Sequence, residues 1–165
     1  MHPSRLPPNE LLAKCTVVRQ RRSGPGGQHR NKVETGIVIT HLDSGIRGEA
    51  TERRSQKENH SVALQRLQVS LAVQVRTPVL ADGPSERWKK RFGSGPLKIN
   101  PVHIEFGSVL SECLDAMQHF DWDQKRAAEW FGCSPSQLVK LIKLEPRAFA
   151  MVNQMRLDHG LTKLR

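Results

Sequence analysis

One stretch, Arg21–Lys32, limits what this chain can fold into more than any other part. It reads RRSGPGGQHRNK, so three glycines and one proline stand among four cationic side chains. Glycine has no Cβ and lets the backbone approach a ligand closely, while proline stiffens one point of a loop. We therefore expect an exposed basic loop, neither helix nor strand, whose N–H groups suit a phosphate or a developing oxyanion. Taken alone, Gly26-Gly27-Gln28 is weak evidence, and a solvated hairpin loop is the favoured interpretation.

The positive charge is concentrated in the front of the chain. The 165 residues carry net charge +10, of which residues 1–60 and residues 61–100 hold +5 each. Residues 101–165 hold eight basic and eight acidic side chains, so they are neutral. We expect a polyanionic partner to meet the front half.

The cysteines and the apolar pattern exclude several classes of protein. Cys15, Cys113 and Cys133 are far apart and form no Cys-x-x-Cys pair, which favours reduced thiols over a zinc ribbon or a disulfide framework. The first ten residues lack the apolar run of a signal peptide, and no later stretch is long enough to span a membrane. The sequence predicts a cytoplasmic protein with no metal, no cofactor and no membrane association.

The front of the chain predicts a small sheet covered by one helix. β-branched residues and alternation predict strands at 15–19, 35–41 and 46–51, with Gly45 in the turn between the second and the third. Ser55 begins a helix that ends before Pro78, and Leu64, Leu67, Leu71 and Val75 form its core stripe. Residues 1–13 are predicted to be an extended arm.

The segment 77–104 is predicted to be a linker, because it is rich in proline and glycine. Its centre, Arg87–Phe92, places four cations between Trp88 and Phe92. One interpretation is stacking on bases with phosphate contacts from Lys89, Lys90 and Arg91. The other is a charged linker whose two aromatic rings pack against one domain.

The remainder, from Glu105 onward, has a helical pattern. Ser108 is expected to cap a first helix, and residues 124–143 resemble a helix-turn-helix with Gly132 at the turn and Ser136 at the start of its second helix. Gln137, Lys140 and Lys143 would lie on the exposed side of that helix. Because the segment is neutral, a helical domain that docks on protein is favoured over a DNA reader.

Residues 22–72 resemble the catalytic domain of the class I peptide-chain release factors. The matching residues are Ser23–His29, Asn31-Lys32, Ile39–Leu42, Gly45-Ile46, Arg54–Gln56 and Asn59. In that family the Gly-Gly-Gln loop enters the peptidyl transferase centre of the large ribosomal subunit and promotes hydrolysis of the peptidyl-tRNA ester. The resemblance therefore implies a carboxylic ester hydrolase.

The resemblance assigns the catalytic role to Gly26, Gly27 and Gln28. The two glycines let the backbone reach the terminal adenosine, and the Gln28 N–H donates to the leaving 3′-oxygen. The Gln28 side chain narrows the site to the size of water, and in the family this glutamine is often N-methylated. The residues expected to contact ribosomal RNA or tRNA are Arg21, Arg22, Ser23, His29, Arg30, Asn31, Lys32, Arg54, Lys89, Lys90 and Arg91.

The chain departs from complete release factors in two respects. It contains neither a Pro-x-Thr nor a Ser-Pro-Phe codon-reading tripeptide, and no room for a codon-reading region is expected before Cys15. It is closer to the short, codon-independent rescue hydrolases, but it lacks their long basic tail: residues 146–165 hold only Arg147, Arg156, Lys163 and Arg165. A neutral helical segment stands in that place, which favours recognition through a partner or through the large subunit alone.

The sequence thus predicts an α+β protein: a β-β-β-α catalytic domain at 1–76, a basic linker at 77–104 and a helical domain at 105–165. The expected function is codon-independent hydrolysis of peptidyl-tRNA on stalled ribosomes or free large subunits, by a monomer that uses its helical domain to dock on a partner protein. Two alternatives remain open. One is a non-catalytic factor that binds ribosomal RNA, and the other is a DNA-binding regulator.

Overall fold

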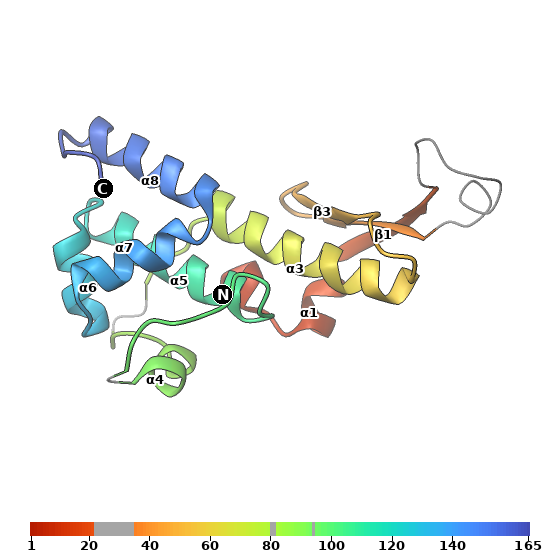
Figure 1. Cartoon of the computed structure of the whole chain (residues 1–165), viewed down its shortest axis with the longest axis horizontal. Helices are drawn as coiled ribbons and strands as arrows, with labels where there is room; N and C mark the ends of the chain where they lie inside the picture. The colour runs from red at the N-terminus through yellow and green to blue at the C-terminus, as the bar shows by residue number, and fades with distance from the viewer. Residues whose placement is uncertain (22–34, 80–81, 94) are drawn as a thin grey trace. The chain divides into compact units, whose positions relative to one another are not determined.

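The chain folds into a three-stranded antiparallel sheet and a set of helices (Figure 1). The computed structural model describes residues 1–21, 35–79, 82–93 and 95–165. These residues form two compact units, the first made of Met1 and Pro3–Leu71, the second of His2 and Ala72–Arg165. The predicted α+β class is confirmed.

The sheet of the first unit has the strand order β1-β2-β3. Strands β1 (Cys15–Gln20), β2 (Gly36–His41) and β3 (Arg47–Ala50) agree with the predicted ranges to within one residue at each end. Gly45 has φ 68° in the turn between β2 and β3, as predicted. On β2, Ile37 and Ile39 are buried whereas Val38 and Thr40 are half-buried, so the expected alternation holds.

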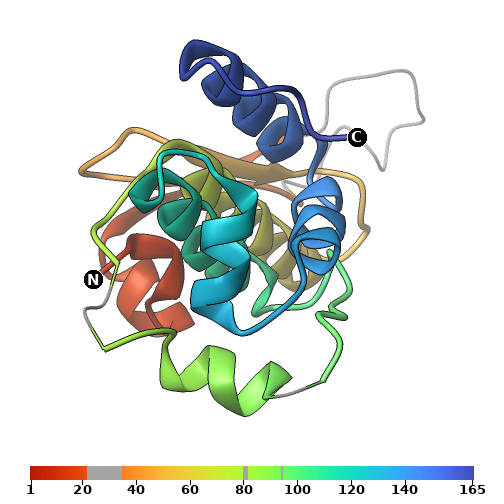
Figure 2. The ribbon, with the colours of Figure 1, turned by 90° about the vertical axis from the view of Figure 1, so that its left-hand side faces the viewer.

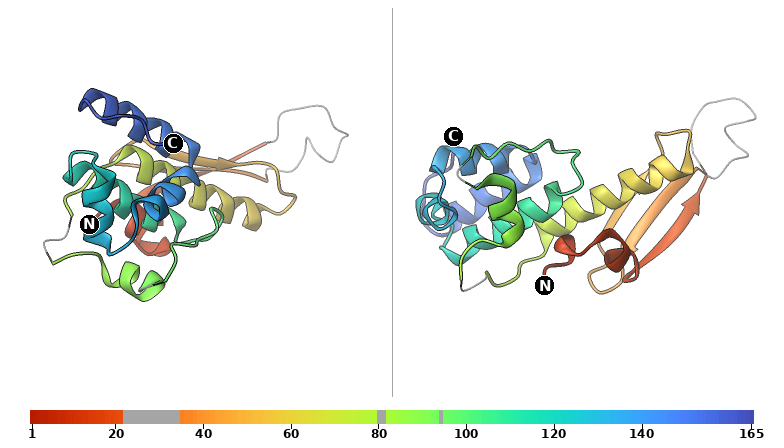
Figure 3. Two further views of the ribbon diagram at one scale, coloured as in Figure 1. Left: turned by 60° about the vertical axis from the view of Figure 1, so that its left-hand side comes forward. Right: turned by 90° about the horizontal axis from the view of Figure 1, so that it is seen from below.

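Helix α3 (Gln56–Gln74) lies along one face of this sheet (Figure 3). Its contact with β3 is a backbone-to-backbone approach at Gly48. A Cβ placed there would lie 2.2 Å from the Ala63 carbonyl oxygen and 2.4 Å from the Leu67 nitrogen. Leu64, Leu67 and Leu71 are buried as predicted. The helix ends before Val75, so the fourth member of the predicted stripe is only half-buried.

The predicted extended arm at 1–13 is wrong, because it forms two short helical elements. These are the 3-10 turn η1 (Pro3–Arg5) and helix α1 (Pro8–Leu12). Proline at the first position of α1 suits a helix start, since its missing N–H would have no partner there. Leu11 is fully buried and belongs to the core, which fixes the entry into β1.

The described part of the second unit contains helices α4 to α8. Their bounds are α4 Glu86–Phe92, α5 Phe106–His119, α6 Gln124–Phe131, α7 Pro135–Lys143 and α8 Pro146–Asp158. Helix α5 packs against α6 and α7, and α7 contacts α8 (Figure 2). Leu110, Leu114, Leu138 and Leu141 are fully buried in this unit.

Helices α6 and α7 form the predicted helix-turn-helix arrangement. Gly132 has φ 67° at the end of α6, a left-handed conformation that favours glycine. The start of α7 differs from the prediction, because Ser134 is its cap and forms a capping box with Gln137. The Ser108 prediction is also wrong: α5 begins at Phe106, and Ser108 is buried inside it.

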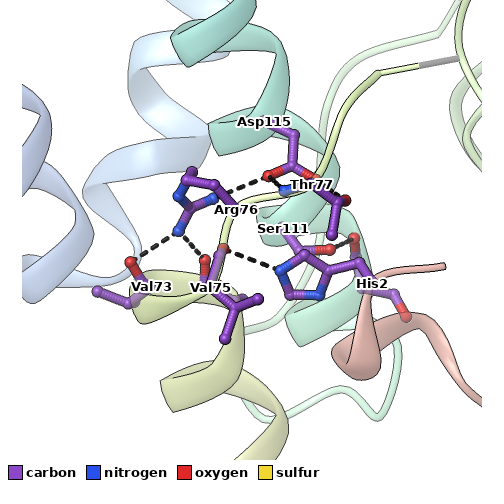
Figure 4. A network of polar contacts seen from close by, with 9 residues as sticks. His2, Val73, Val75, Arg76, Thr77, Ser111 and Asp115 are labelled. Carbon is purple, nitrogen blue, oxygen red and sulfur yellow. Dashed lines mark hydrogen bonds and ion pairs between the residues drawn. The ribbon is translucent and has the colours of Figure 1, made fainter. Parts of the chain in front are cut away.

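A polar row on α5 and its N-cap Glu105 holds Arg76, Thr77, Ser85, Arg87 and Arg91. Glu105 pairs with Arg91, the Ser108 hydroxyl accepts from Arg87 at 2.7 Å, and Glu112 accepts from Ser85. At the far end, Asp115 accepts from Arg76 and from both the backbone and the side chain of Thr77 (Figure 4). The four positions are spaced by three or four residues, so they share one helix face.

Because of this row, the segment predicted as a linker is packed into the second unit. Trp88 is 2% exposed and Phe92 is 6% exposed, and Trp88 stacks on Phe131 with ring centroids 3.9 Å apart. The structure therefore supports the second interpretation of the aromatic pair, in which both rings pack against one domain. Neither ring is free to stack on a base.

We predict that Gly48→Ala lowers the free energy of unfolding of the first unit by about 3 kcal/mol, because the methyl group would collide with backbone atoms of α3 that cannot move aside. Gly45→Ala is the matched control. It meets open space and only strains a positive φ, so it should cost about 1 kcal/mol. Urea unfolding, monitored by circular dichroism, measures the free energy of unfolding of both variants. Equal losses would contradict the close-packing argument.

We also predict that Asp115→Ala destabilises the second unit by about 3–5 kcal/mol, because it leaves Arg76 and the Thr77 N–H without their buried acceptor. Asp158→Ala, at an exposed helix end, should change stability by about 0.5 kcal/mol or less. Denaturant unfolding, followed by the fluorescence of Trp88, Trp122 and Trp130, which all lie in this unit, reports the difference. An Asp115 variant as stable as the Asp158 control would show that the polar row is not structural.

Candidate functional site

The candidate site is the connection between β1 and β2, which carries the basic glycine-rich stretch. The predicted catalytic residues Gly26, Gly27 and Gln28 lie outside the described residues. So do six predicted RNA-contacting residues: Arg22, Ser23, His29, Arg30, Asn31 and Lys32. The described residues define the two ends of this connection and the framework that holds them.

The two ends leave the sheet side by side. Gln20 and Gly36 are the last partners of the β1–β2 ladder, so the chain departs and returns at adjacent positions, with a Cα separation of about 5 Å. A Cβ on Gly36 would lie 2.9 Å from the Gln20 carbonyl oxygen and 3.0 Å from Cγ2 of Thr51. Glycine is therefore needed at this position for the strands and the end of β3 to approach one another.

Asn59 ties the returning end of the connection to helix α3. This side chain is fully buried. Its Nδ2 donates to the carbonyl oxygen of Thr35 at 2.7 Å and to that of Arg53 at 3.0 Å, and its Oδ1 accepts from the Arg53 N–H at 2.9 Å. One amide thus joins three backbone groups from two segments far apart in the sequence.

An exposed ion pair braces the same region from outside. Arg66 donates to the Glu49 carbonyl oxygen at 2.7 Å and to the Glu52 carboxylate at 2.7 Å. The pKa of Glu52 is below its ordinary value, first because its own backbone N–H hydrogen-bonds the carboxylate; desolvation opposes this, and donation from Thr51 and Arg66 lowers the pKa further. The segment between β3 and α3 is thereby held on both sides.

Two predicted RNA-contacting residues lie at this end of the first unit. Arg21 follows the last residue of β1 and is exposed. Arg54 is exposed next to Arg53, the residue that Asn59 holds. The framework therefore presents cations where the glycine-rich connection begins and ends, and such an arrangement suits an anionic partner.

The other three predicted RNA-contacting residues lie on α4 in the second unit. Lys89 forms an ion pair with Glu86 at 2.9 Å, and Arg91 pairs with Glu105. Lys90 is exposed. Two of these three cations thus have carboxylate partners within their own unit, which reduces what they can offer a polyanion.

Sequence reasoning did not assign the roles of Gly36, Gly48 and Asn59. A signal for the glycines was available, because a glycine inside a strand pattern marks a bulge or a close backbone approach. For Asn59 no local pattern exists: its partners Thr35 and Arg53 are 24 and 6 residues away. Only the fold brings them together.

The described residues contain no candidate metal-binding cluster and no candidate membrane-spanning helix. Within residues 1–21, 35–79, 82–93 and 95–165, no group of three or more His, Cys, Asp or Glu side chains is placed to hold a metal ion. Among the same residues, no helix combines the length and apolar character needed to cross a bilayer. Burial raises the pKa of the Cys113 thiol well above its ordinary value, and to a lesser degree that of Cys15.

Comparison with known proteins identifies the class. The RF-1 domain family matches residues 8–95, more than half of the chain, and the chain belongs to this family of class I release factors. One relative is peptide chain release factor 1 of Acidiphilium cryptum (strain JF-5), which is 41% identical over 101 residues. That match covers 60% of this chain and 28% of the relative, so the chain spans less than a third of the relative's length. Helices α5 to α8 lie beyond the family match.

We predict that Asn59→Ala lowers the free energy of unfolding by about 2–4 kcal/mol, since three backbone groups lose their buried partner. Lys57→Ala, on the exposed side of the same helix, should cost about 0.5 kcal/mol or less. Hydrogen exchange gives a local readout, because the backbone N–H of Arg53 should exchange much faster in the Asn59 variant. Unchanged protection of Arg53 would contradict the role assigned to Asn59.

Proposed function

We propose that this protein hydrolyses the ester bond of peptidyl-tRNA in the peptidyl transferase centre, independently of a codon, on stalled ribosomes or free large subunits. One observation carries the proposal. The tripeptide Gly26-Gly27-Gln28 stands in a connection whose ends are fixed by the Gln20–Gly36 pair and by Asn59, in a member of the RF-1 domain family.

The proposed reaction depends more on the placement of the water and on stabilisation of the leaving oxygen than on a strong base. Water adds to the ester carbonyl, the bond to the tRNA 3′-oxygen breaks, and the proton of the water passes to that oxygen. The products are a free peptide acid and a tRNA with a 3′-hydroxyl. In this scheme Gly26 and Gly27 admit the backbone, the Gln28 N–H stabilises the charge on the leaving oxygen, and the Gln28 side chain admits water alone. N-methylation of Gln28 would be compatible with these roles.

The anchored ends support this scheme physically. A mispositioning of about 1 Å can cost a catalytic group about 100-fold in rate, so the loop must be mounted on rigid elements. Gly36 and Asn59 provide such a mount through close packing and buried hydrogen bonds. In the proposal Arg21 and Arg54, together with Arg22, Arg30 and Lys32, contact ribosomal RNA phosphates on either side of the loop.

The proposal takes codon independence from the resemblance to the short rescue hydrolases; neither codon-reading tripeptide occurs in these 165 residues. We propose that catalysis belongs to the first unit and that the helical unit recognises the target, by docking on a partner protein or on a fixed ribosomal surface. A non-catalytic factor that binds ribosomal RNA is the second candidate. The ion pairs that Lys89 and Arg91 form with carboxylates do not favour it, because they reduce what these cations can offer RNA.

We predict that Gly27→Ala lowers peptide release by about 100-fold or more and leaves ribosome binding nearly unchanged, because the added methyl group blocks the approach of the backbone to the ester. Release is measured with peptidyl-tRNA on stalled 70S ribosomes and on isolated large subunits, and binding by co-sedimentation.

Gly45→Ala is the control for this experiment, because it is the same chemical change in the turn at the opposite end of β2. It should release peptide at nearly the normal rate. Normal release by the Gly27 variant would refute the catalytic assignment. A wild-type protein that binds ribosomes without releasing peptide would establish the non-catalytic alternative.

A further inference from the structure

The second unit has a strongly basic surface that the neutral charge count of residues 101–165 conceals. A pocket of about 360 Å³ is lined by Lys140 and Lys143 of α7 and by Lys163 and Arg165 of the C-terminal segment. A second pocket, of about 490 Å³, is lined by Lys98, His103 and Lys140 among others. Lys140 lines both pockets, so they adjoin. We call Lys98, Lys140, Lys143, Lys163 and Arg165 the basic band.

Most of the acidic residues in 101–165 already have partners that are not members of the basic band. No Asp or Glu is among the described residues that line either pocket, and no ion pair of the described residues involves a member of the basic band. Seven of the eight acidic residues in 101–165 already have partners, as pairs, helix caps or buried acceptors: Glu105, Glu112, Asp115, Asp121, Asp123, Glu145 and Asp158. Glu105 pairs with Arg91 and His103, which line the second pocket, whereas the members of the basic band have no ion-pair partner among the described residues.

The C-terminal wall of the first pocket is fixed in place. Arg156 is 4% exposed, and its guanidinium donates to the carbonyl oxygens of Thr162 and Trp122. The Leu164 N–H donates to Oδ1 of Asn153 at 2.7 Å, and the Leu164 side chain is buried. Lys163 and Arg165 flank this anchored residue and are exposed. Their charges are thus presented on a built surface.

The wall formed by α7 is fixed by its core face. Leu138, Leu141 and Ile142 are fully buried, which sets the rotation of the helix and leaves Lys140 and Lys143 exposed. Cations in the last turn also stabilise the helix end, and Lys143 lies 5.3 Å from the ring centre of Phe149. Neither effect accounts for Lys98, Lys163 or Arg165, which belong to other segments.

We propose that the basic band binds the sugar–phosphate backbone of RNA without reading bases. Lysine and arginine clusters bind phosphates through charge, which fixes position and carries no sequence information. No Phe or Trp is among the described residues that line either pocket, so neither pocket offers the stacking platform of a single-strand binder. The choice of RNA rests on the proposed ribosomal function, and DNA or an acidic protein surface are outcomes of the test.

The first test is lysine footprinting of the full chain with an amine-acetylating reagent, with and without a double-stranded RNA hairpin. Lys98, Lys140, Lys143 and Lys163 should become at least threefold less reactive with RNA. Lys125, exposed on α6 outside the band, should not change. Equal reactivity of the band lysines with and without RNA would overturn the proposal.

The second test compares two double variants of equal charge by fluorescence anisotropy over a range of salt. Lys140→Gln with Lys163→Gln should lower the slope of log Kd against log salt by about 1.4 to 1.8, since two phosphate contacts are lost. Lys14→Gln with Lys125→Gln should leave the slope unchanged, and melting curves confirm that both variants fold. Equal slopes would overturn the proposal, and so would tighter binding to duplex DNA of the same sequence or to a polyglutamate chain.

These measurements contain no peptidyl-tRNA, so they are independent of the catalytic proposal. Gly27→Ala should lose peptide release and keep RNA protection of the band lysines. Loss of band protection with normal release would refute the RNA proposal alone, whereas intact protection without release by the wild type would refute only the hydrolase.

Discussion

The first unit depends on the absence of a single methyl group at Gly48. With no Cβ there, the backbone of α3 lies directly on β3, and a Cβ would come within 2.2 Å of the Ala63 carbonyl oxygen. That contact sets the height of α3 over the sheet. The height in turn decides whether Asn59, two turns toward the start of the helix, reaches Thr35 at the end of the glycine-rich connection. A contact in the core thus determines how the end of the candidate site is held in place.

The second unit is organised differently, around polar groups on one helix. Helix α5 offers Glu105, Ser108, Glu112 and Asp115 to a segment that would otherwise be a Pro- and Gly-rich linker. Buried carboxylates are costly unless they are paired and fully hydrogen-bonded, so each of these partners has a defined place. Among the described residues, the lysines of α7 and the basic residues of the C-terminal segment have no ion-pair partner. The basic surface of the unit is thus formed by cations that the structural ion pairs do not use.

Local patterns predicted most of the fold. The alternation around Ile37 and Ile39 and the turn at Gly45 gave correct strands, and Gly132 gave the turn between α6 and α7. The predicted helix start at Ser108 was wrong because α5 begins at Phe106 and Ser108 is buried inside it, and the start predicted at Ser136 was displaced because Ser134 caps α7. Residues 1–13 were misjudged because the burial of Leu11 depends on tertiary packing. For the site, composition predicts the loop, which lies outside the described residues and stays a prediction, whereas Asn59 joins residues that no short sequence window contains.

The placement of the loop at paired strand ends also has a mechanical consequence. The chain leaves from β1 and returns to β2 at the same end of the ladder, beside the Gln20–Gly36 pair. A force that draws the loop outward along the strands pulls β1 and β2 in the same direction. It therefore loads the hydrogen bonds between β2 and β3 in shear, so that they resist together instead of opening one after another. The Asn59 bond to Thr35 adds resistance at the point where the force enters. The site is mounted to keep its position under load, as contact with a large moving assembly would require.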